Sequence, residues 1–67
     1  MKKFRIKTEI GYVKGFSIKW NCVQSCHGSY ILDAKEFTRN ALDKFIMKYS
    51  GGGYGFDIKD CVVEEIV

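Results

Sequence analysis

The sequence predicts an α+β fold in which a small antiparallel-rich sheet of three to four strands carries one helix on one face, in the order β-β-(β)-α-β. Three observations support this fold: alternating strand-like runs near the start, an amphipathic stretch with helix start and stop signals, and a β-branched run at the end. Sixty-seven residues are enough for one domain, so residues 1–67 are expected to fold as a single unit. An apolar content of 46% argues against disorder.

The first strands are predicted from a period-two alternation of apolar and polar residues. In KKFRIKTEI, the positions from Phe4 to Ile10 alternate with charged side chains, which is typical of a half-buried strand. Gly11 and the Lys14-Gly15 pair indicate a turn. A second alternating run follows, with the inward positions Phe16, Ile18, Trp20 and Cys22. The two runs are expected to form an antiparallel hairpin.

The helix is predicted over the stretch from Asp33 to Gly53. Asp33 and Glu36 have the spacing of a capping box, which satisfies free N–H groups of a first helical turn. Lys48 lies near the negative end of the helix dipole, and Gly51 can take the left-handed conformation that ends a helix. The positions at helical spacing that would face the sheet are Ala34, Phe37, Ala41, Leu42, Phe45, Ile46 and Tyr49.

Two further segments complete the predicted sheet. Residues 29–32 allow two interpretations, a third short strand or an extended entry into the helix. A final strand is predicted over residues 56–67, but its apolar residues change phase near Asp60. A bulge there is expected to bring Cys61 and Val63 onto the face of the strand's first apolar residues.

No cofactor is predicted. Cys22, Cys26, His27 and Cys61 could in principle supply four zinc ligands, but zinc ligands usually come in two short pairs and Cys61 stands alone. Buried thiols without metal are the more common state, and metal binding by these four residues is left open. The GGGYG segment follows a helix C-terminus, whose partial charge is negative, whereas phosphate loops precede a helix N-terminus.

The chain is expected not to be an enzyme. Its only histidine, His27, is adjacent to Cys26, and adjacent side chains rarely form a nucleophile–base pair. A domain of this size also offers little room for a pocket that excludes water. The sequence has no signal-peptide pattern and no apolar run long enough to span a bilayer, so a cytoplasmic location with no membrane partner is expected.

Candidate binding residues fall on two expected surfaces. If the helix covers one sheet face, four cations share the open face: Lys3, Arg5, Lys7 and Lys19. Such a face can contact phosphates, so nucleic-acid binding is the alternative function. On the outer helix face, Arg39 and the isolated Met47 could contact a protein. A free sheet edge also allows a homodimer.

Charge is distributed unevenly along the chain. Residues 1–20 hold six lysines and arginines against one glutamate, whereas residues 54–67 hold four carboxylates against one lysine. If the last strand pairs beside the first, these charges would partly neutralise each other across the strands.

The layout resembles that of short α+β proteins encoded by bacterial phages and mobile elements. The similar features are the start MKKFxI, a helix with an acidic cap, and an ending of the type FDI followed by VEEI. Such proteins often bind a larger host protein, including defence nucleases. The resemblance therefore implies a non-enzymatic protein-interaction domain that inhibits or modulates a host nucleic-acid-processing or defence protein. It assigns no functional residues.

Overall fold

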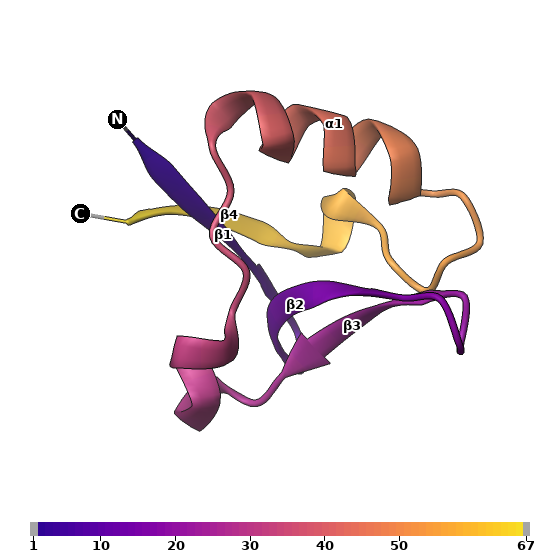
Figure 1. Cartoon of the computed structure of the whole chain (residues 1–67), viewed down its shortest axis with the longest axis horizontal. Helices are drawn as coiled ribbons and strands as arrows, with labels where there is room; N and C mark the ends of the chain where they lie inside the picture. Colours follow the sequence, from indigo (N-terminus) through magenta and orange to yellow (C-terminus); the bar gives the residue numbers. More distant parts are fainter. Residues whose placement is uncertain (1, 67) are drawn as a thin grey trace.

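The computed structural model describes residues 2–66, apart from the side-chain surroundings of Gly28 and Tyr30. Over this range the chain forms a four-stranded antiparallel sheet and one α-helix, which confirms the α+β fold class (Figure 1). The strands are β1 (Lys3–Thr8), β2 (Gly11–Ser17), β3 (Cys22–Cys26) and β4 (Val62–Ile66), in the spatial order β3-β2-β1-β4. The helices are α1 (Arg39–Tyr49) and the short 3₁₀ helices η1 (Gly28–Asp33) and η2 (Ile58–Asp60).

Strand β1 organises the sheet because it has partners on both sides. It pairs with β4 along most of its length, from Lys3 opposite Ile66 to Lys7 opposite Val62. Its ladder with β2 is recorded only at Lys7 and Thr8. The first and last parts of the chain therefore lie side by side in the sheet.

An extended segment, residues 34–37, lies between the first half of β1 and β2. Phe4 and Phe37 exchange two backbone hydrogen bonds of 2.8 Å, and the Lys35 N–H donates to the Val13 carbonyl at 2.9 Å. Backbone donors and acceptors that a longer β1–β2 ladder would use are satisfied in this way. The segment then leads directly into α1.

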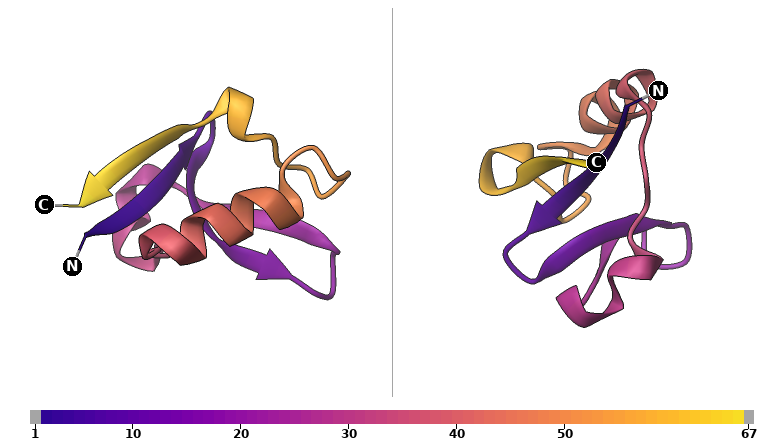
Figure 2. Two further views of the ribbon diagram at one scale, coloured as in Figure 1. Left: turned by 90° about the horizontal axis from the view of Figure 1, so that it is seen from above. Right: turned by 90° about the vertical axis from the view of Figure 1, so that its left-hand side faces the viewer.

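The core lies between one face of the sheet and α1 (Figure 2). Its buried members are Phe4, Ile6, Val13, Phe37, Leu42, Phe45 and Phe56. At the far end of α1, Tyr49 stacks on Phe16 at 4.5 Å between ring centroids, and Tyr54 meets both rings edge-on. This aromatic group fixes the β2–β3 hairpin to the end of the helix.

The predicted helix start at Asp33 is wrong. Asp33 ends η1, and α1 begins at Arg39 after Thr38, whose Oγ1 accepts a hydrogen bond from the Ala41 N–H. The intervening residues are extended because their N–H groups bond to sheet carbonyls instead of to helical ones. Residues 29–32 belong to η1, so neither a third strand nor an extended entry forms there. The predicted helix stop is confirmed, since Gly51 has φ +71° just after the cap at Ser50.

The predicted second strand is also wrong in position. Strand β2 covers Gly11–Ser17, which includes glycines that were expected in a turn, and the real turn is at residues 18–21. Asn21 has a left-handed φ of 51°, and Ser17 Oγ accepts from the Trp20 N–H, so side-chain hydrogen bonding stabilises the turn where the alternation suggested a strand. Gly15 lies where the β2–β3 register shifts.

The last strand begins later than predicted. Residues 58–60 form η2, capped by Asp57, and β4 starts only at Val62. The change of phase is made by this 3₁₀ turn and not by a bulge near Asp60. Cys61 packs against the core, whereas Val63 pairs with Ile6 but is 39% exposed. Val67, the predicted end of the strand, lies outside the described residues.

Candidate functional site

The open face of β1 holds three of the four predicted cations. Lys3, Arg5 and Lys7 alternate with the buried Phe4 and Ile6, so their side chains lie on the face that α1 does not cover. Lys19 lies in the β2–β3 turn, at the opposite end of the molecule from the start of β1 (Figure 1). The predicted basic face is therefore a strip of three cations, and Lys19 belongs to another surface.

The basic strip, Lys3, Arg5 and Lys7, is partly neutralised by β4. Arg5 lies opposite Glu64, as expected if the first and last strands pair. Glu64 also accepts a 2.9 Å hydrogen bond from the Tyr12 hydroxyl, and this bond raises the pKa of Tyr12 above its ordinary value. The Arg5 guanidinium lies 5.9 Å from the Tyr12 ring centroid. From the sequence, Tyr12 was expected in a loop or at a strand end, free to stack on a base, because β2 was placed too late in the chain; the structure places it within β2.

The outer helix face presents the other two predicted residues separately. Arg39 forms an ion pair with Asp43 at 3.7 Å, and both side chains are exposed. Arg39 also lies 5.8 Å from the Phe4 ring centroid, so it belongs to the end of the molecule where β1 starts. Met47 is 85% exposed near the other end of α1. These two residues do not form one contact patch with the basic strip.

The hairpin tip, residues 18–21, is a surface that the sequence did not predict. Ile18 is 90% exposed and Trp20 is 66% exposed, although the alternation placed both inward. Lys19 Nζ lies 5.2 Å from the centroid of the Trp20 ring. Large apolar side chains are thus concentrated on a turn that the Phe16 ring anchors to the helix. The unusual φ of Asn21 is the feature that ends the alternation, and no glycine or proline marks it in the sequence.

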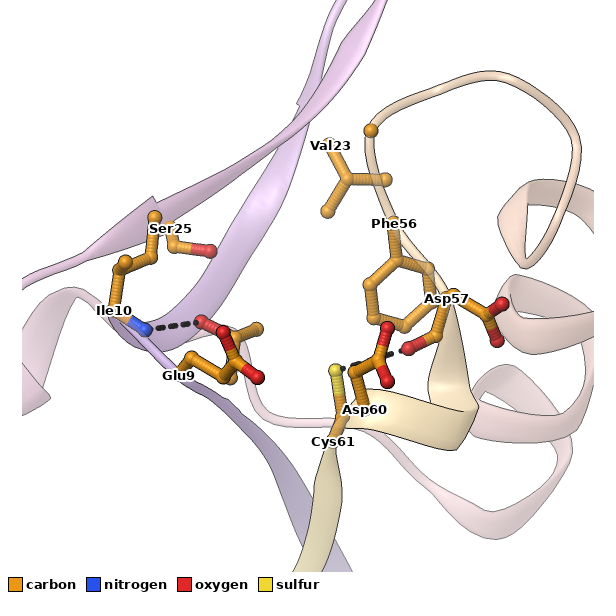
Figure 3. A pocket seen from close by; sticks show the side chains of 10 residues that line it. Glu9, Ile10, Val23, Ser25, Phe56, Asp57, Asp60 and Cys61 are labelled. Carbon is orange, nitrogen blue, oxygen red and sulfur yellow. Dashed lines mark hydrogen bonds between the residues drawn. The ribbon is translucent and has the colours of Figure 1, made fainter.

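A pocket of about 260 Å³ lies between the β1–β2 turn, β3 and η2 (Figure 3). Val23 and the ring of Phe56 form an apolar wall, and the Cys61 thiol lies at its base. The carboxylates of Glu9 and Asp60, both exposed, stand on opposite sides of the Cys61 thiol, as Figure 3 shows. This acidic pocket is built from three separate segments of the chain, which is why no sequence motif indicates it.

Cys61 reports on the electrostatics of the acidic pocket. Its Sγ donates to the Asp57 carbonyl at 3.4 Å. Burial raises the pKa of the Cys61 thiol, and the negative charges of Asp60, Asp57 and Glu9 raise this pKa further. The folded state therefore holds the thiol proton more tightly than the unfolded chain, so this contribution to stability is full below the ordinary cysteine pKa and is lost as pH rises from there through the raised pKa of the folded thiol.

We expect the Asp60→Asn substitution to lower the Cys61 pKa and to speed alkylation of Cys61 by iodoacetamide about threefold near pH 8, because the thiolate is the reacting species. Peptide mass mapping over a time course separates this site from the other cysteines. Asp43→Asn, on the outer face of α1, removes the same charge elsewhere and should leave the rate unchanged. Equal rates in Asp60→Asn and the unmodified chain would contradict the assigned electrostatics.

Metal-ligating side chains do not gather within residues 2–66. No group of three or more His, Cys, Asp or Glu side chains in that range is placed to hold a metal ion. His27 uses Nδ1 to contact Ser29 Oγ at 2.9 Å, next to the start of η1. No helix in the described part of the chain is both long and apolar enough to cross a membrane.

The geometry thus offers four separate surfaces: the basic strip, the outer helix face, the hairpin tip and the acidic pocket. The acidic pocket is concave and combines apolar and charged walls, as does a second hollow of about 520 Å³ lined by Lys2, Phe4, Arg39, Val63 and Glu65. Only the hairpin tip exposes a tryptophan. Comparisons of the chain with known protein families, with curated proteins and with solved structures found no match.

Proposed function

We propose that this chain is a non-catalytic domain that binds another protein through its hairpin tip. The observation that carries the proposal is the exposure of Ile18 and Trp20 on one short turn. Burying a large apolar side chain stabilises a fold or a complex by about 1.5–3 kcal/mol. The isolated domain does not gain this free energy at Ile18 or Trp20. Tryptophan is also strongly enriched among the residues that dominate binding energy at protein interfaces.

The support beneath the hairpin tip favours a binding role. Phe16 precedes the tip in β2 and stacks on Tyr49 of α1, while Val23 follows the tip and bonds through its N–H to the Tyr54 carbonyl at 2.9 Å. Both sides of the hairpin are thereby tied to the rest of the domain. A surface held in place before contact loses less conformational entropy on binding, which increases affinity.

The resemblance in layout to short phage and mobile-element proteins suggests the class of partner. By that analogy the partner is a larger host protein that processes nucleic acid or takes part in defence, and this domain inhibits or modulates it. Such an activity needs only a rigid contact surface and no catalytic group. The exposed tip supplies the surface that this role requires.

The Trp20→Ala substitution is expected to reduce capture of the partner from native host lysate by about thirtyfold, the effect typical of an energetic centre of an interface. Quantitative mass spectrometry of the captured proteins measures this loss, with and without nuclease treatment of the lysate. Met47→Ala is the matched control because Met47 is also a large exposed apolar residue, but it lies on α1.

Capture in this experiment should survive nuclease treatment and the Met47→Ala change. A partner lost on nuclease treatment would be bridged by nucleic acid, and one lost with Met47→Ala but retained with Trp20→Ala would bind the helix. Either outcome contradicts the proposal. Circular dichroism of both variants confirms that the fold is intact.

The placement of Tyr12 favours a second candidate, single-stranded nucleic acid on the open face. An aromatic ring beside Arg5 and Lys7 provides the combination of stacking and phosphate contact that such proteins use. Glu64 opposes this function, since it places a carboxylate within the same surface. Binding through all three cations of the basic strip would give a log–log salt slope of about −2 in an oligonucleotide titration. Under the protein-binding proposal we expect no saturable binding of the oligonucleotide at 150 mM salt. At that concentration the Debye length is about 8 Å, so exposed charges are strongly screened.

A further inference from the structure

We propose that the acidic pocket binds an arginine side chain of the partner protein. This inference rests on the proposed protein-binding function and specifies part of the partner's chemistry. Three observations carry it: an apolar-walled cavity, two exposed carboxylates on either side of it, and the absence of any cation among its lining residues.

The two carboxylates are available for a ligand. Among the described residues, neither the Glu9 nor the Asp60 carboxylate forms a hydrogen bond or an ion pair. The third acidic side chain, Asp57, is already used, because its Oδ1 accepts from the Lys59 N–H at 3.0 Å and caps η2. In Figure 3 the Asp57 carboxylate is turned away from the space between the other two. A cation entering the pocket therefore meets two unpaired carboxylates.

The walls distinguish arginine from a simple cation. A guanidinium is a planar group with five N–H donors, so it can donate to carboxylates on two sides at once. Its plane can lie against an aromatic ring, and Phe56 presents its ring to the pocket. The methylene stem of the arginine would cover Val23. A lysine ammonium, which is compact and strongly hydrated, uses these walls less well.

The pocket is positioned for contact by the same partner that covers the hairpin tip. Val23, on its apolar wall, lies in β3 only two residues after Asn21 of the tip. Ile10 lines the pocket and is 78% exposed, which gives the mouth an apolar rim. A partner can therefore bury the rim residue while its arginine enters the pocket. The local negative charge, on a chain of net charge +3, also gives the contact a defined orientation.

The test is a titration of the isotopically labelled domain, followed by NMR, with N-acetyl-arginine methylamide as the probe. The capped citrulline analogue has nearly the same shape without the charge, and capped lysine has the charge without the planar group. We expect saturable shifts at Val23, Phe56 and Cys61 with arginine in the millimolar range, binding several-fold weaker with lysine, and none with citrulline. Free arginine, a metabolite without a peptide backbone, should bind no better than the capped form.

Matched variants locate the binding. The double variant Glu9→Gln with Asp60→Asn should weaken arginine binding at least tenfold. Asp33→Asn with Glu36→Gln removes the same two charges outside the pocket, from two exposed positions, and should change binding less than twofold. The NMR spectra themselves show whether each variant remains folded.

Three outcomes would overturn the inference: citrulline binding as well as arginine, an unchanged affinity in the Glu9 and Asp60 double variant, or free arginine binding tenfold more tightly than the capped form. The titration needs no partner, so its result is independent of the capture experiment. If capped arginine does not bind while Trp20→Ala abolishes capture of the partner, the assignment of the acidic pocket to arginine is wrong, whereas binding through the hairpin tip is supported. If capped arginine binds and Trp20→Ala does not change capture of the partner, the assignment of the hairpin tip as the binding surface is wrong.

Discussion

Replacing Gly11 by alanine should reduce the free energy of unfolding by about 4 kcal/mol or more, an effect in the exceptional range for a single substitution. Gly11 opens β2 with φ +149°, and a Cβ atom at this position would lie 1.9 Å from the Cys26 carbonyl oxygen. That contact can be relieved only by moving β3, because the next residue, Tyr12, is paired with Cys26 in the β2–β3 ladder. Urea unfolding followed by circular dichroism measures the loss.

The same strand contains a control for backbone strain. Gly15 has φ +148°, but a Cβ atom added there would meet nothing within 4 Å. Gly15→Ala should therefore show only the strain of an unfavourable conformation, about 1–3 kcal/mol. The difference between the losses of unfolding free energy in Gly11→Ala and Gly15→Ala measures the effect of the close approach of β2 and β3. Equal losses in the two variants would show that the approach at Cys26 is not what fixes glycine at position 11.

The Phe37→Ala substitution should lower the free energy of unfolding by about 3–5 kcal/mol. Phe37 is 1% exposed, and its ring lies 5.0 Å from that of Phe45, centroid to centroid. A domain of this length has a total stability of roughly 3–10 kcal/mol, so the variant is expected to be largely or partly unfolded at 37 °C. Thermal unfolding and urea titration both measure the change.

Met47→Ala serves as the control for Phe37→Ala. Met47 is a large apolar residue on α1 but is 85% exposed, so its truncation should change the free energy of unfolding by no more than about 0.5 kcal/mol. A loss of less than 1 kcal/mol in Phe37→Ala would contradict the assignment of Phe37 to the centre of the core.

The helix illustrates how far local signals determine this fold. Its apolar spacing and its end near Gly51 could be predicted because both depend on residues within the helix or next to it. Its start could not, because Ala34 and Phe37 continue the helical spacing while their segment is held extended by sheet partners. Those partners, Phe4 and Val13, are more than twenty residues away in the sequence. Long-range hydrogen bonding overrides a local capping pattern here.

The candidate surfaces were predictable to the extent that they depend on one strand. The alternation in β1 correctly placed Lys3, Arg5 and Lys7 on a common face. The hairpin tip was missed because Ile18 and Trp20 continue the alternation of a strand that a turn interrupts. The acidic pocket was missed because it requires the β1–β2 turn, β3 and η2 to meet, and no single segment carries that information.

The extended segment at residues 34–37 also constrains the order in which the domain assembles. Strand β1 is made before the other strands of the sheet, yet two of its partners, residues 34–37 and β4, are made much later. Each contact closes a long loop whose entropy must be overcome before the core residues meet. The β2–β3 hairpin can form early from nearby residues, whereas the central strand stays incomplete until Val62–Ile66 has been synthesised. Folding of the sheet is therefore expected to be cooperative and late, and the nascent chain exposes Phe4 and Ile6 until β4 pairs with β1.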